Sequence, residues 1–344
     1  MAHRPLAVPF RSVALSALAF TVSIATTVAM PVFVGQSWSA IGSIVAAVSV
    51  PTLLALATLW VAGLLVHTVV LTAAMPGLSI GRALLLNLSG SAVSNLLPFG
   101  GAAGMGLGYL MARSWKFSTS SYASYTAISN VWNVLAKLLV GSSLLCVALV
   151  LGLQLPASLN GVIAMGAGGM LLGALAIAGV IGSARMAGAV GGAIDRSGNA
   201  LLARAGRPQG LDMRSWILTT RHESAGAVAD GWVRLTAGVL AYMLLQAVLL
   251  WACLLAVGAH AGLLAVAVTF GVERLLTVLP FTPGGSGLAE LGAAGVMIAM
   301  GAPPAQAAAG VLLYRLFTFV MEIPVGGASA LLWLRRYRAT AAPA

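Results

Sequence analysis

Long runs of apolar residues recur from one end of this chain to the other. The first extends from Ser12 to about Val34, and others cover about Ser118 to Leu153, Ser158 to Ile181 and Val233 to Val257. A helix that crosses a bilayer needs about 20 mostly apolar residues. We expect the first run to be an uncleaved span, because it lacks a clear small-residue cleavage site. The sequence therefore predicts an all-α, polytopic integral membrane bundle.

The charged residues indicate the same class of protein. They make up 7% of the 344 residues, whereas a soluble domain averages about 25%. The net charge of +11 comes from basic residues that flank the apolar runs, and no basic stripe with interleaved aromatics suggests a nucleic-acid partner. Cys146 and Cys253 fall inside apolar helices and show no metal-ligand spacing. We expect no metal and no cofactor.

Two apolar regions are interrupted by proline and glycine. Residues Ser79 to Arg113 are split by Pro98–Gly101, and residues Leu263 to Met300 are split by Pro280–Gly285. None of the resulting pieces is long enough to span a bilayer. A pair of half-helices that enters and leaves by the same side fits better. The sequence thus predicts about six full spans and two re-entrant hairpins, with one or two short amphipathic helices on the membrane surface between 183 and 232.

The distribution of Lys and Arg predicts the orientation. The loops at 35–42, 152–160, 258–262 and 301–304 contain neither residue, while the termini, Arg82, Arg113 and the segment 185–234 hold nearly all of them. By the positive-inside rule, the basic segments and both termini are cytoplasmic. The expected location is the cell membrane. The first hairpin then enters from the cytoplasm and the second from outside.

An internal repeat accompanies this opposite orientation. Leu97–Phe99 recurs as Leu279–Phe281, and each copy precedes a glycine pair, Gly100–Gly101 or Gly284–Gly285. The long helix after each hairpin carries polar residues at i, i+3 and i+7, a spacing that places them on one helix face. The two sets, related by a shift of 185 residues, are Asn130, Asn133 and Lys137, and Arg315, Thr318 and Glu322. Two similar units facing opposite ways are typical of transporters. The alternative is that Pro-Gly breaks recur by chance.

Ionisable residues within the apolar segments are candidates for function. Each costs about 2.5–3.5 kcal/mol at mid-bilayer on insertion scales. An ion pair between Lys137 and Glu322 that holds the two repeats together is the structural alternative. Arg315 offers a fork of donors suited to a phosphate, and the half-helix N-termini after each glycine pair add backbone N–H groups. Together they predict a site for an anionic head group.

These motifs resemble a known family. The segments Asn95–Ala103, Leu279–Glu290 and Leu313–Leu316 are similar to hallmarks of the lysylphosphatidylglycerol synthase transmembrane (flippase-like) family, and the resemblance covers essentially the whole chain. It implies a membrane domain that translocates lipids such as aminoacylated phosphatidylglycerol between leaflets. The chain resembles the stand-alone form, which has no aminoacyltransferase domain. Members often carry Glu-Arg and a nearby Asp after the first hairpin, where this chain has Ser129, Asn130 and Asn133.

On this basis we expect residues 1–344 to form a single flippase-like domain. Its parts are a first repeat core (75–153), a basic cytoplasmic loop (183–232) and a second repeat core (258–338). The expected activity is translocation of a phospholipid or lipid-linked polar head group across the cytoplasmic membrane, through a polar site between the two hairpins, and no enzymatic activity. The expected partners are membrane lipids with an anionic or lipid-linked head group. The candidate substrate-binding residues are Asn95, Pro98, Gly100, Gly101, Asn130, Asn133, Lys137, Glu273, Arg274, Pro283, Gly284, Gly285, Gly287, Glu290, Tyr314, Arg315 and Glu322.

Two other functions are compatible with the sequence. Gly284–Gly287 matches the short Gly-x-Ser-Gly motif of rhomboid-like intramembrane proteases, but Ser286 would need a base and no histidine follows His260. An intramembrane enzyme that processes lipids or peptides is thus one alternative. The other is a scaffold or assembly factor whose basic segment 185–234 recruits a partner.

Overall fold

The computed structural model describes residues 10–97, 100–151, 157–204, 210–278 and 285–341, and within these ranges the chain forms helices and no strand. Five segments are long and apolar enough to cross a membrane. They are α3 (Val50–Ala74), α6 (Thr119–Val150), residues Met165–Gly182 of α7 (Ala157–Gly182), residues Val228–Ala256 of α9 (Met213–Ala256) and the segment Pro304–Tyr337. A sixth is formed by α1 (Phe10–Phe33) and α2 (Trp38–Ala46), if this pair, bent by 90°, is one span. The prediction of an all-α, multi-pass membrane bundle is confirmed.

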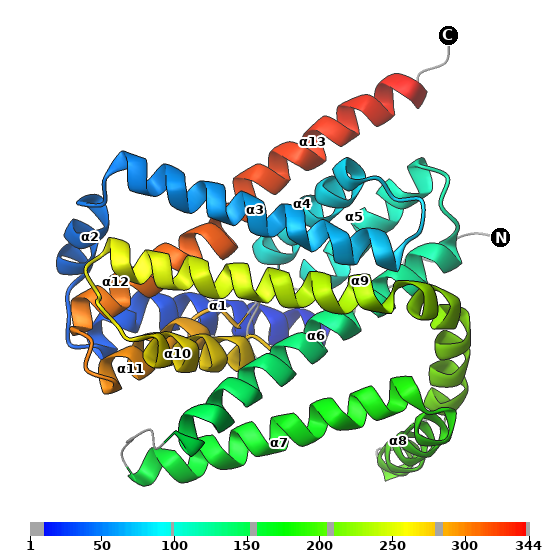
Figure 1. Cartoon of the computed structure of the whole chain (residues 1–344). Helices are drawn as coiled ribbons and strands as arrows, with labels where there is room; N and C mark the ends of the chain where they lie inside the picture. The colour runs from blue at the N-terminus through cyan, green and yellow to red at the C-terminus, as the bar shows by residue number, and fades with distance from the viewer. Residues whose placement is uncertain (1–9, 98–99, 152–156, 205–209, 279–284, 342–344) are drawn as a thin grey trace.

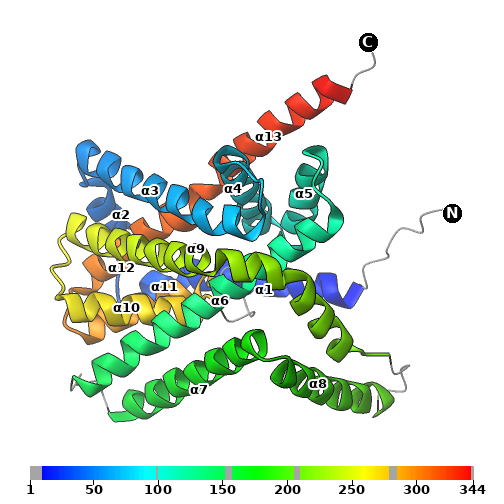
Figure 2. The same ribbon diagram turned by 45° about the vertical axis from the view of Figure 1, so that its right-hand side comes forward.

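Both interrupted regions form pairs of short helices. The first pair is α4 (Ile80–Leu96) with α5 (Gly100–Ser114), and the second is α10 (Leu263–Leu276) with α11 (Leu288–Ala299). The two helices of each pair pack against each other, and each is shorter than the roughly 20 residues of a span. The first pair lies at the end of the bundle where α1 begins and α13 ends, and the second pair lies at the opposite end (Figures 1 and 2). The hairpins therefore oppose each other, as predicted.

The long helix after each hairpin packs against the other hairpin. Helix α6 packs on α10, and α13 (Glu322–Ala341) packs on α4. Glycine makes both approaches possible: a Cβ atom on Gly141 would lie 3.0 Å from the Gly271 carbonyl oxygen, and one on Gly326 would lie 2.7 Å from the Leu88 carbonyl carbon. Gly141 and Gly326 are separated by 185 residues, the shift that relates the two polar sets. The repeat seen in the sequence thus has a counterpart in the packing.

The last span is interrupted. Helix α12 (Pro304–Arg315) leads into a π-helical turn, Leu316–Val320, and then into α13. Met321 donates its backbone N–H to the carbonyl of Leu316, five residues earlier, at 2.8 Å. Pro324 explains the wider turn, because it has no N–H for the Val320 carbonyl and its ring would clash with that carbonyl in a regular helix. The last span is therefore two α-helices joined by a π-helical turn.

The polar segment between α7 and the next span contains α8 (Ala184–Arg204) and the beginning of α9. Helix α9 starts at Met213 and continues to Ala256 without a break, so the second part of this polar segment is the beginning of a long helix and not a separate short one. Asp212 caps the helix, and its side chain accepts the Ser215 N–H at 3.2 Å. A favourable cap with no proline downstream explains the early start. Figures 1 and 2 place α8 beside this first part of α9.

Candidate functional site

Four charged side chains meet in the interior of the second hairpin and the helix that follows it. Glu273, Arg274, Glu290 and Arg315 are 0%, 5%, 4% and 6% exposed, and they come from α10, α11 and α12. Two acids and two bases leave no net formal charge. Side chains buried this completely need such a balance of charge, because an uncompensated charge in a low-dielectric interior is costly.

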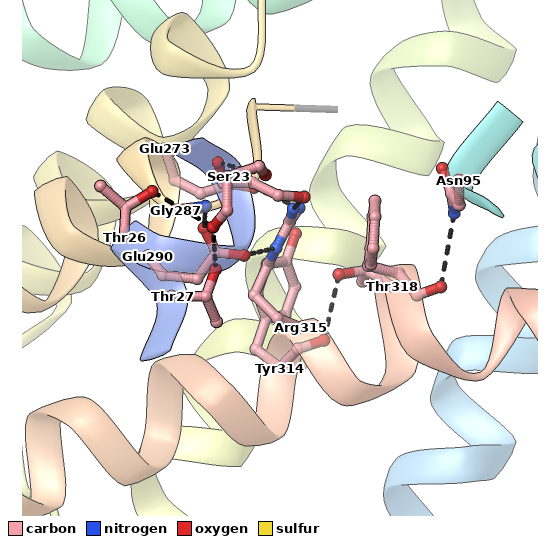
Figure 3. Close-up of polar contacts among 12 residues, drawn as sticks. Ser23, Thr26, Thr27, Asn95, Glu273, Gly287, Glu290, Tyr314, Arg315 and Thr318 are labelled. Carbon is pink, nitrogen blue, oxygen red and sulfur yellow. Dashed lines mark hydrogen bonds and ion pairs between the residues drawn. The ribbon is translucent and has the colours of Figure 1, made fainter. Parts of the chain in front are cut away.

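Arg315 is held by both halves of the hairpin. Its Nε donates to Glu290 Oε1 at 2.7 Å, its Nη2 donates to Ser286 Oγ at 3.2 Å, and its Nη1 lies 3.7 Å from Glu273 Oε1 (Figure 3). The guanidinium also lies over the Phe319 ring, 5.0 Å from its centroid. Glu290 is itself positioned by the start of α11, where its Oε2 accepts the Gly287 N–H at 2.6 Å. The arginine predicted to bind an anion is therefore bound by carboxylates here.

Arg274 links the hairpin to α9 and α12. Its guanidinium forms a two-point ion pair with the carboxylate of the preceding residue, Glu273. It also donates to Gln246 Oε1 at 2.6 Å and to the Tyr314 hydroxyl at 2.7 Å. That hydroxyl in turn donates to Gln246 Oε1 at 3.2 Å. We call the connected set the hairpin network; it comprises Gln246, Glu273, Arg274, Ser286, Glu290, Tyr314 and Arg315.

The second hairpin returns through a glycine turn that α1 covers. Gly285 and Gly287 have φ values of 71° and 87°, in the left-handed region that glycine adopts readily. The buried Ser23 of α1 donates its hydroxyl to the Ser286 carbonyl at 2.9 Å. A Cβ atom on Gly287 would collide with Thr26, also on α1 (Figure 3). The first helix thus packs against the tip of the second hairpin.

The first hairpin contacts the segment that follows Arg315, from the side opposite the second hairpin. Asn95, at the end of α4, donates its Nδ2 to the Phe319 carbonyl of the π-helical turn at 3.4 Å. Figure 3 shows Asn95 on one side of this segment and Glu290 on the other, with Arg315 pointing toward Glu290. The helix that carries Arg315 therefore passes between the two hairpins.

The remaining predicted residues are not joined to the hairpin network. Asn130 is exposed and donates to the Thr126 carbonyl of its own helix at 2.8 Å. The buried Asn133 Oδ1 has no hydrogen-bond partner. Among the ion pairs of the described residues none joins Lys137 to Glu322, so that structural alternative is not realised. Three candidates, Pro98, Pro283 and Gly284, lie outside the described residues.

Three members of the site were missed by the sequence reasoning. Gln246 is the one amide in the apolar run 233–257, and that isolation was a usable signal. Ser23 and Phe319 gave no signal, because a single serine or phenylalanine is ordinary in an apolar helix. Their roles depend on which helices pack together.

Ser286 does not have the surroundings of a nucleophile within the described residues. The side chain that contacts its Oγ is Arg315. A guanidinium has no acceptor and stays protonated in proteins, so it cannot remove the hydroxyl proton. The contact is better explained as a hydrogen bond that positions Arg315.

The two glycines of the first motif are expected to respond differently to substitution. A Cβ atom on Gly100 would lie 2.5 Å from the Ser94 carbonyl carbon, whereas one on Gly101 would have no neighbour within 4 Å. Gly100→Ala should cost about 1–3 kcal/mol of stability. Gly101→Ala should be neutral or gain up to about 1 kcal/mol from helix propensity. Thermal unfolding of both variants in detergent measures the difference, and equal melting temperatures would contradict it.

One protein family matches nearly the whole chain. A family model described as lysylphosphatidylglycerol synthase TM region matches residues 13–326, a range that contains both hairpins and the hairpin network. No match was found among curated proteins. The chain therefore belongs to the lysylphosphatidylglycerol synthase transmembrane-region family.

Proposed function

We propose that this protein translocates a phospholipid, or another lipid-linked polar head group, between the leaflets of the cytoplasmic membrane. The observation that carries the proposal is the helix bearing Arg315, which lies between two hairpins that enter the bundle from opposite ends. Interrupted helices in opposed repeats are typical of transporter binding sites. Membership of a family named for a lipid synthase's membrane region supports a lipid as the substrate.

The hairpin network suggests how an anionic head group would be handled. Arg315 binds carboxylates from both halves of the second hairpin, Glu290 and Glu273. A phosphate offers the same kind of acceptor to a guanidinium fork and can replace one carboxylate. Such an exchange keeps the buried cation neutralised throughout, so the transient cost of an unpaired charge is avoided. The proposed substrate is accordingly an anionic membrane lipid, moved without covalent chemistry.

The proposed orientation has both termini in the cytoplasm. The described ends of the chain lie at the same end of the bundle, together with the first hairpin (Figures 1 and 2). The Lys- and Arg-rich segments are on that side and the loops without basic residues are on the other. The first hairpin would then open toward the inner leaflet and the second toward the outer one.

Reconstitution into vesicles tests the proposal. A fluorescent anionic phospholipid is placed in both leaflets, and a membrane-impermeant quencher reports how fast inner-leaflet probe reaches the outside. Wild-type protein should accelerate this exchange above that of protein-free vesicles, and more for an anionic than for a zwitterionic probe. Exchange equal to that of protein-free vesicles for both probes would reject the proposal.

Arg315→Lys is the informative variant in this assay. It keeps the charge that balances the two carboxylates, but an ammonium lacks the planar fork that contacts several acceptors at once. We expect exchange at least tenfold slower than that of the wild type. The matched control is Arg335→Lys on the exposed face of α13, which should leave the rate unchanged. Equal rates for Arg315→Lys and the wild type would exclude a head-group role for this arginine.

A further inference from the structure

A second basic site lies outside the hairpin network, between α8 and the beginning of α9. A pocket of about 420 Å³ is lined by three arginines, Arg185 and Arg196 of α8 and Arg214 of α9, together with small residues and Leu218. The volume lies within the range of small-molecule sites, about 300–1,000 Å³. We call it the arginine pocket.

The spacing of residues on α8 builds this pocket. Arg185, Gly188, Gly192 and Arg196 follow one another at i, i+3, i+7 and i+11, which places them on one helix face. The two glycines leave room for the side chain of Arg214: a Cβ atom on Gly188 would lie 3.6 Å from its Nε, and one on Gly192 would lie 3.9 Å from its Cδ. Arg214 therefore lies along the glycines that separate the two arginines of α8.

Among the described residues, the nearby carboxylate forms no ion pair with these arginines. Asp195 is occupied by the start of α9, where Oδ1 accepts the Met213 N–H at 2.6 Å and Oδ2 accepts the Arg214 N–H at 3.1 Å. In the described part of the chain, Arg185, Arg196 and Arg214 form no ion pair. Three like charges around one pocket repel each other, and a bound anion would relieve that repulsion. Arginine forks match the oxygens of a phosphate in particular.

The surroundings of the pocket place it at the level of lipid head groups. The face of α8 roughly opposite the pocket exposes Met186, Val190 and Ile194 at intervals of four residues. A helix with an exposed apolar stripe and a basic face lies in the membrane interface, with its charges among the head groups. Phosphates of lipids and of soluble metabolites both have access to that level.

We infer that the arginine pocket is a binding site for a phosphate group, carried either by an anionic phospholipid or by a small soluble phosphate. The pocket uses α8 and α9 residues that do not belong to the hairpin network, so it can exist whether or not the protein moves lipids. Binding in the pocket differs from diffuse attraction to an anionic surface, because it depends on the position of Arg214 and on the open space beside that side chain.

Calorimetric titration of the full-length protein in neutral detergent tests this inference. The ligands are inorganic phosphate and short-chain phosphatidylglycerol. Arg214→Gln should weaken binding at least tenfold, whereas Arg204→Gln, which removes the same charge from the last turn of α8 outside the pocket, should change it less than twofold. Binding of phosphatidylglycerol alone would identify a lipid as the source, and binding of both ligands would show that free phosphate suffices.

A second variant separates the pocket from its charge. Gly192→Leu keeps all the arginines but fills the space beside Arg214, and leucine is a better helix former than glycine. We expect it to weaken binding as much as Arg214→Gln does, with an unchanged melting temperature for the ligand-free protein. The inference is overturned if neither ligand binds the wild type, if the Arg204 and Arg214 variants lose affinity equally, or if the Gly192 variant binds like the wild type.

Discussion

Arg315→Ala is expected to lower the free energy of unfolding by about 3–5 kcal/mol, because it leaves a buried charge without its partner. The substitution removes the ion pairs with Glu290 and Glu273, and both carboxylates are almost completely buried. It also removes the donor to Ser286 at the tip of the hairpin. Thermal unfolding of the purified variant in detergent, compared with the wild type, measures the effect.

A double variant distinguishes loss of charge balance from loss of shape. Arg315→Met with Glu290→Gln removes one charge of each sign and keeps a long apolar side chain in place of the guanidinium stem. Replacing a buried ion pair by residues of similar volume is often neutral. The double variant should therefore recover most of the lost stability and still fail to accelerate lipid exchange. Recovery of exchange along with stability would show that Arg315 is structural.

Gly326→Ala is expected to separate α13 from α4. A Cβ atom at this position would lie 2.7 Å from the Leu88 carbonyl carbon and 2.8 Å from the Ala92 Cβ, so backbone must move to admit it. Overpacking of this kind typically costs about 1–3 kcal/mol, and contact with backbone places this case at the upper end. The π-helical turn that Asn95 contacts leads directly into α13, so a shift of α13 should also slow lipid exchange.

The neighbouring glycine provides a matched control for that prediction. A Cβ atom on Gly327 would have no neighbour within 4 Å. Gly327→Ala should therefore gain up to about 1 kcal/mol, since alanine is the better helix former. The two adjacent substitutions are thus expected to change the melting temperature in opposite directions. Similar shifts for both would show that α13 and α4 do not pack closely through Gly326.

The sequence predicted the elements of the fold well. Apolar run length located the spans, and Pro98 and Pro280 marked hairpins whose helices are indeed too short to cross. These features are local, because run length and helix breakers act within a few turns of chain. The π-helical turn was missed although its cause, Pro324, was visible. Proline is tolerated in membrane helices in several ways, and the surroundings determine which occurs.

The sequence predicted the membership of the site better than its connections. It identified Glu273, Arg274, Glu290 and Arg315, because ionisable residues in apolar segments are costly and therefore conspicuous. It did not predict that Arg315 binds Glu290 while Lys137 and Glu322 remain apart. The i, i+3, i+7 spacing assumed a regular helix after Arg315, and a π-helical turn changes the direction in which Glu322 points.

The apolar runs and their breaks were sufficient to establish a membrane bundle with two hairpins, since a bilayer admits few other arrangements of such segments. The pairing of charges was not, because it depends on which helices meet. Each long helix packs against the opposite hairpin, through Gly141 on α6 and Gly326 on α13. That close packing brings Gln246 to Arg274 and Ser23 to the hairpin tip, across separations of 28 and 263 residues. Contacts over such separations are set by packing in three dimensions, which no local pattern of residues encodes.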